Sequence, residues 1–182
     1  MGLGSGAAWS LPAAGLLQSC DHTPRLRTTL GTEDLPLLTE IGETILPTTA
    51  TSPGAGAAGI GEYLLLMYQD GLPPEEQAIL LEGLNLLDAR AAKSLKTSFE
   101  KASKTERLSL LKEFQQEATA HKERNAEVPE APPHFFDVLK GLTLTGYFTS
   151  EIGMTQAREY LPVPGRYEGC VPHGNGDKVW AL

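Results

Sequence analysis

Hydrophobic residues recur every three or four positions from residue 32 onward, which is the period of an amphipathic helix. A first helix is predicted to begin at Thr32 and to stop at Pro47. A second helix is predicted from about Ala57 to Gln69, with Gly71 ending it. The predicted buried faces are Leu35, Leu38, Ile41 and Ile45 in the first helix and Ile60, Leu64 and Met67 in the second.

Two further helices carry clear start signals. Pro73 and Pro74 precede two glutamates, an arrangement that favours a helix start because proline suits the first turn and acids suit its positive end. Ser103 and Glu106 have the spacing of a capping box. The predicted core faces are Leu80, Leu84, Leu87, Ala91 and Leu95 in the first of these helices and Leu108, Leu111, Phe114 and Ala118 in the second.

Residues 121–132 are polar and then proline-rich, so they are predicted to form a loop. Pro132-Pro133 then opens a fifth helix with Phe135, Phe136, Leu139, Leu142 and Tyr147, and a short sixth helix follows Thr149 or Ser150. His134 stands at the start of the fifth helix, where its ring suits a capping or interface role better than metal binding.

From Pro162 the chain is rich in Pro, Gly and aromatic residues, which indicates coil with room for a hairpin or two. No alternating strand pattern is evident. The predicted fold class is therefore all-α: a single-domain irregular helical bundle with a Pro/Gly/aromatic-rich C-terminal coil. We divide the chain into a signal-like segment and linker (1–31), a helical domain (32–161) and a tail (162–182) that packs on the domain or on a partner.

The N-terminal 19 residues carry no charge, and the run from Gly6 to Leu17 resembles the apolar part of an export signal. The run is too short and too rich in glycine to span a bilayer. Leu17-Gln18-Ser19-Cys20 resembles a lipobox, although no lysine or arginine precedes the apolar run. We expect an exported protein, periplasmic or membrane-associated; the alternative is a plain apolar tail.

The two cysteines, Cys20 and Cys170, have two interpretations. In an oxidising compartment they could form a disulfide. Alternatively, Cys20 carries lipid, and Cys170 is free or bridges to another chain. Two thiolates cannot hold an iron–sulfur cluster or a four-ligand zinc site unaided.

Composition removes other classes of function. The net charge of −8 argues against nucleic-acid binding, because binding to phosphates depends on Lys and Arg.

Gly54 to Gly59 match the dinucleotide pattern Gly-x-Gly-x-x-Gly, but Pro47 and Pro53 make a preceding buried strand improbable, so a loop is predicted. We expect no catalytic, cofactor-binding or metal-binding residue. An enzyme would need a site assembled from His134, Glu151 and the tail.

Two C-terminal stretches carry a more specific signal. One begins Pro133-His134-Phe135-Phe136 and continues as Leu142-Thr143-Leu144-Thr145-Gly146-Tyr147-Phe148-Thr149-Ser150-Glu151-Ile152-Gly153. The other runs Tyr160-Leu161-Pro162-Val163-Pro164-Gly165-Arg166-Tyr167-Glu168-Gly169-Cys170. Together with the weaker stretch from Ile45 to Ile60, they resemble the gluconate 2-dehydrogenase subunit 3 family, and the resemblance covers about residues 32–181.

The resemblance implies a non-catalytic small subunit that supports maturation and export of a large flavoprotein of the glucose–methanol–choline type. The large subunit would hold FAD and oxidise a sugar or sugar acid, and a cytochrome c subunit often accompanies it. The family's usual twin-arginine signal is absent from this sequence. The alternative is a free-standing, lipid-anchored helical periplasmic protein without a dehydrogenase. Candidate core or interface anchors are Phe135, Phe136, Tyr147, Phe148, Tyr160, Arg166, Tyr167 and Trp180.

Overall fold

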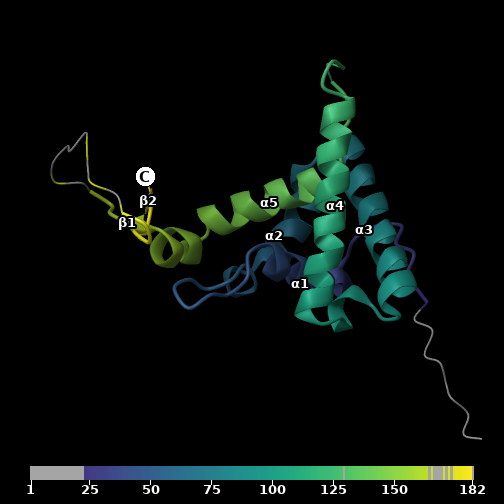
Figure 1. The fold of residues 1–182 in the computed structure, drawn as a ribbon, viewed down its shortest axis with the longest axis horizontal. Helices are drawn as coiled ribbons and strands as arrows, with labels where there is room; N and C mark the ends of the chain where they lie inside the picture. Colours follow the sequence, from purple (N-terminus) through teal and green to yellow (C-terminus); the bar gives the residue numbers. More distant parts are fainter. Residues whose placement is uncertain are drawn as a thin grey trace, which may run out of the picture.

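A computed structural model describes residues 23–128, 130–163, 165, 170, 172 and 174–181. The predicted all-α class is confirmed, since helices dominate and one short strand pair accompanies them in the described residues (Figure 1). In chain order the elements are η1 (Thr32–Asp34), α1 (Leu35–Ile45), η2 (Gly56–Ala58), α2 (Ile60–Leu66), η3 (Met67–Gly71), α3 (Pro74–Leu95), η4 (Phe99–Lys101), α4 (Lys104–Arg124), α5 (Phe135–Thr149), η5 (Gly153–Ala157), β1 (Glu159–Tyr160) and β2 (Trp180–Ala181).

The helix starts agree best with local sequence signals. The Ser103 hydroxyl accepts a hydrogen bond from the backbone N–H of Glu106, and the Glu106 carboxylate accepts one from the N–H of Ser103, which completes the predicted capping box. α3 begins at Pro74 as predicted. α2 begins at Ile60 rather than Ala57, because Gly59 adopts a left-handed conformation (φ 67°) that separates it from the preceding 3-10 turn.

Two predictions about α4 are wrong. The helix does not end at residue 120 but continues to Arg124, where basic residues in the last turn suit the negative end of the helix. Leu108 was expected in the core but is 43% exposed, whereas Leu110 is buried. The buried stripe is instead Arg107, Leu110, Leu111, Phe114 and Ala118.

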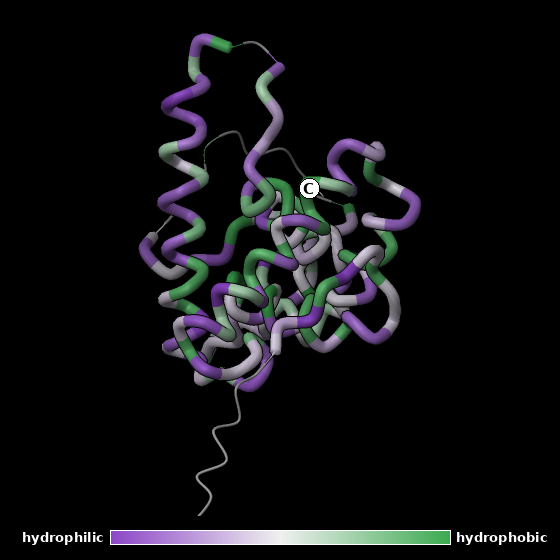
Figure 2. The backbone as a smooth tube through the Cα atoms, turned by 90° about the vertical axis from the view of Figure 1, so that its right-hand side faces the viewer, coloured by the Kyte–Doolittle hydropathy of each residue, from purple (hydrophilic) through white to green (hydrophobic). Residues whose placement is uncertain are grey.

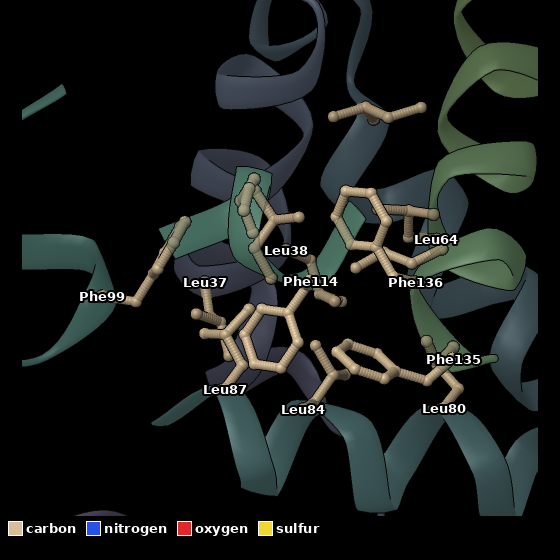
Figure 3. Close-up of a cluster of buried hydrophobic side chains, with 14 of the residues drawn as sticks. Leu37, Leu38, Leu64, Leu80, Leu84, Leu87, Phe99, Phe114, Phe135 and Phe136 are labelled. Carbon is tan, nitrogen blue, oxygen red and sulfur yellow. The ribbon is translucent and has the colours of Figure 1, made fainter. Parts of the chain in front are cut away.

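The core lies where α1, α2, α3, α4 and α5 meet. Leucines from α1, α2 and α3 surround four phenylalanines, and Figure 3 shows these side chains pointing toward one another. Phe114 and Phe135 meet edge to face with their ring centroids 5.0 Å apart. Gly83 allows this approach of α5 to α3, because a Cβ there would lie 2.0 Å from the Phe135 ring. Figure 2 shows the contrast between this core and the mostly hydrophilic turns of α4 that project from the body.

Residues 23–31, assigned above to the N-terminal segment and linker, pack onto the helical domain; we call them the N-terminal strap. Leu30 is buried in the core, and the Arg27 side chain lies between the carboxylates of Asp34 (2.6 Å) and Asp88 (2.5 Å). Asn85 bonds both the backbone N–H and the carbonyl of Arg27. The folded unit therefore begins before residue 32.

Candidate partner-binding site

The aromatic anchor candidates divide into two groups. Phe135, Phe136 and Tyr147 are buried in the core, and Phe148 packs half-buried beside them. Tyr160 and Trp180 are 47% and 44% exposed. Arg166 and Tyr167 lie outside the described residues. The core therefore accounts for the aromatic residues of α5, and the exposed candidates lie beyond it.

Tyr147 connects α5 to the loop of residues 47–59. Its hydroxyl donates a hydrogen bond to the carbonyl of Pro53 (2.5 Å) and lies 2.8 Å from the Ser52 hydroxyl. Gly146, one residue earlier, lets α5 come close to α2, because a Cβ there would lie 2.4 Å from the Tyr63 ring. Figure 1 shows the loop running alongside α5 toward η5. The loop is therefore held in place on the side that faces the end of α5.

The Glu43 carboxylate holds the other side of the loop. It accepts hydrogen bonds from the backbone N–H groups of Thr48 (2.8 Å) and Gly56 (2.9 Å). Burial by itself would raise the pKa of Glu43, but these hydrogen bonds outweigh it and lower the pKa. A Cβ at Gly54 would lie 2.2 Å from this carboxylate. The glycines thus make room for the loop to close around an acid.

The chain beyond α5 forms a separate projection, which we call the C-terminal arm: η5, β1, β2 and the described residues around them, 150–163 and 174–181. β1 and β2 pair in parallel, with Glu159 opposite Trp180 and Tyr160 opposite Ala181. The tail therefore returns to pair beside η5 instead of forming the hairpin allowed for above. Figure 1 shows the arm at the far end of α5, away from the other helices.

Apolar side chains of the arm face solvent. Beside Tyr160 and Trp180, the exposed set includes Leu161, Val163 and Val179, of which Val163 is 79% exposed. Monomeric proteins expose single apolar residues freely, but here five exposed apolar residues belong to one small element. The three aliphatic members could not be predicted from the sequence, because coil residues have no periodicity from which exposure can be inferred.

His134 and Glu151, the two residues named above as parts of a possible catalytic site, lie beyond opposite ends of α5. His134 caps the first turn of α5, where its Nδ1 accepts the N–H of Phe136 (3.2 Å), which confirms the predicted capping role. Glu151 is exposed beyond the other end of that helix, whose 15 residues span roughly 22 Å at the rise of an α-helix. Within the described ranges, no group of three or more His, Cys, Asp or Glu side chains is arranged to hold a metal.

Other expectations remain predictions. Cys170 is exposed, and Cys20 lies outside the described residues, so neither the disulfide nor the lipid anchor is tested. None of the helices in the part of the chain that the structure describes has the length and hydrophobicity to cross a bilayer.

Comparison with known proteins gives one match. The family model of gluconate 2-dehydrogenase subunit 3 matches residues 32–165, from the first helical turn to the middle of the C-terminal arm. Neither the curated proteins nor the solved structures contain a match. Because the matched range covers most of the chain, the protein belongs to the gluconate 2-dehydrogenase subunit 3 family.

Proposed function

We propose that this chain is a non-catalytic small subunit that binds and stabilises a large FAD-dependent dehydrogenase subunit of the glucose–methanol–choline type. The large subunit holds the flavin and oxidises a sugar or sugar acid, and a cytochrome c subunit completes the electron path. The small subunit assists maturation and export of the flavoprotein to the periplasm or a membrane face. Family membership supports the role of a subunit in a dehydrogenase complex.

The observation that carries the proposal is the set of exposed apolar residues on the C-terminal arm. Tyr160, Leu161, Val163, Val179 and Trp180 are each exposed, and all five belong to an element that stands apart from the bundle (Figure 1). Interfaces are enriched in Tyr and Trp, and a few such residues supply most of the binding free energy. In the complex, the arm contacts the large subunit while the bundle keeps the arm in place through Tyr147 and the loop of residues 47–59.

The proposal is tested by expressing a tagged form of this chain in its native host and measuring whether the large subunit co-purifies with it. The wild-type chain is expected to bring down a yellow flavoprotein with sugar or sugar-acid dehydrogenase activity. The double variant Tyr160→Ser/Trp180→Ser should recover far less of it, since each anchor contributes about 2 kcal/mol or more at an interface.

The matched control is the double variant Leu66→Ser/Leu86→Ser, which removes two exposed leucines from α2 and α3. It should recover the flavoprotein as the wild type does. A colourless chain recovered alone at native abundance contradicts the proposal. Equal losses in the two double variants would show that the arm is not the interface.

A further inference from the structure

A pocket lies at the base of the C-terminal arm. Its volume is about 420 Å³, and its walls come from three parts of the sequence. They are the loop at Thr51 and Ser52, the segment with Phe148 near the end of α5, Ala157 at the end of η5 and Arg158 after it, and the tail at residues 176–179. Each wall is anchored. Ser52 bonds Tyr147, and Lys178 donates to the carbonyl of Gln156 in η5 (2.5 Å). The pocket therefore forms where separately anchored segments converge.

Arg158 is a cation in this pocket without a carboxylate partner among the described residues. Its guanidinium lies over the ring of Phe148, 4.5 Å from the centroid. A cation–π contact of this kind takes up no hydrogen-bond acceptor, so the N–H groups of the guanidinium stay available. A planar guanidinium held on an aromatic ring is suited to bind a carboxylate through two parallel hydrogen bonds.

The other charges in the pocket leave an excess of positive charge. Lys178 uses one N–H for Gln156, and an ammonium group has three. Asp177 is the only described carboxylate that lines the pocket, and one of its oxygens already accepts the N–H of Gly174 (2.7 Å). Two cations and one acid thus lie together in a chain whose net charge is −8. Local charge of this sign attracts an anionic group.

The apolar part of the pocket adjoins the surface proposed to bind the large subunit. Phe148, Ala157 and Val179 line it, and Val179 also belongs to the exposed apolar set of the arm. We propose that an aspartate or glutamate side chain of the large subunit enters this pocket and pairs with Arg158 and Lys178, an inference that rests on the proposed function. The exposed apolar residues of the arm pack around that ion pair and exclude water from it.

Binding of the purified large subunit to variants of the full chain tests this pairing. Arg158→Gln and Lys178→Gln remove the charge but keep a polar side chain, and Arg158→Glu reverses the charge. We expect Kd to rise about tenfold or more for Arg158→Glu, because a buried pair becomes a repulsion between like charges. The rise of Kd with ionic strength should be smaller for both Gln variants than for wild type, since an ion pair has been removed.

The matched control is Lys112→Glu, which changes charge by the same amount at an exposed position of α4. It should leave Kd within about twofold of wild type. Equal melting temperatures of all variants verify that folding is intact.

The outcomes separate this inference from the proposed function. If Arg158→Glu binds as wild type does while Tyr160→Ser/Trp180→Ser binds weakly, the arm is the interface but the pocket receives no carboxylate. An equal loss for Arg158→Glu and Lys112→Glu also overturns the inference, because only overall charge would then matter. If the wild-type chain binds no flavoprotein at all, the proposed function fails and the inference fails with it.

Discussion

His134 illustrates how one side chain makes a helix start depend on pH. Its neutral ring accepts the N–H of Phe136, a role that the imidazolium cannot perform because both ring nitrogens then carry protons. A positive charge is also unfavourable at the positive end of a helix. Burial, followed by the nearby His121, lowers the pKa of His134, and Arg90 acts in the same direction against Asp137 and Glu117. The geometry of the cap and the surrounding charges thus both favour the neutral form.

The stability of the chain should therefore fall as the solution becomes mildly acidic. Because the pKa of His134 is lower in the folded state than in the unfolded state, its contribution is complete above the unfolded value of about 6.5. That contribution is lost as pH falls through the folded-state pKa. Urea unfolding at about pH 7.5 and about pH 5 should show a fall of about 1 kcal/mol from loss of the cap.

His134→Asn provides the control, because an asparagine side chain accepts the same N–H bond but does not titrate in this range. The pH dependence of the free energy of unfolding should be smaller in that variant than in wild type. If both proteins lose the same stability between the two pH values, other groups cause the change and the cap does not.

At the scale of elements, the N-terminal strap shows how a segment without regular structure is fixed to a helical domain. Arg27 pairs with Asp34 and Asp88, and Asn85 bonds the backbone of the same residue. Along the sequence, Asp34 lies 7 residues from Arg27 and Asp88 lies 61 residues away. Asn85 lies 58 residues away. The docking of the strap therefore depends on α3, which supplies Asn85 and Asp88.

Arg27→Ala should destabilise the fold by about 3–5 kcal/mol, because the Asp88 carboxylate would stay buried without a counter-charge. Chemical denaturation measures the change. Arg25→Ala is the matched control: the Arg25 side chain is half exposed and pairs with Glu33 and Asp34, so its loss should cost less than about 1 kcal/mol. Equal effects of the two substitutions would show that the buried position of Arg27 has no special importance.

Helix boundaries could be predicted from sequence where a local signal defines them. The pair Ser103 and Glu106 predicts the start of α4 because both of its hydrogen bonds lie within one turn. The buried face of that helix was harder to predict from the sequence, since the choice between Leu108 and Leu110 depends on which side of the helix meets α1. Arg107 takes a core position through its pairing with Glu40, a partner 67 residues away that no helical periodicity indicates.

At the scale of the whole molecule, the candidate site could be predicted only in part. The aromatic residues near the C-terminus were recognised as a group, but sequence could not assign Phe135, Phe136 and Tyr147 to the core and Tyr160 and Trp180 to the surface. That division depends on where α5 leaves the bundle. The pocket was not foreseen either, because its walls come from residues 51–52, 148–158 and 176–179, which are brought together only by the fold.

The separation of bundle and arm makes a prediction about folding. A chain that ends at Arg158 keeps α1 to α5 and η5 but loses both strands and the tail. Of the described residues that it loses, only Ala181 is buried, so the melting temperature should fall by less than about 4 °C, equivalent to about 1 kcal/mol for a domain of this size. Phe135→Ala in the full chain is the comparison, because loss of a buried phenylalanine costs about 3–5 kcal/mol.

Thermal unfolding followed by circular dichroism shows whether the bundle folds without the arm or needs it. If the truncated chain melts close to wild type and far above Phe135→Ala, the bundle folds without the arm, and the arm's exposed apolar residues are free to serve a partner. If it melts as low as Phe135→Ala, the arm is part of the folding unit. Its apolar residues would then contribute to the stability of the chain itself, and their exposure would no longer support an interface with the large subunit.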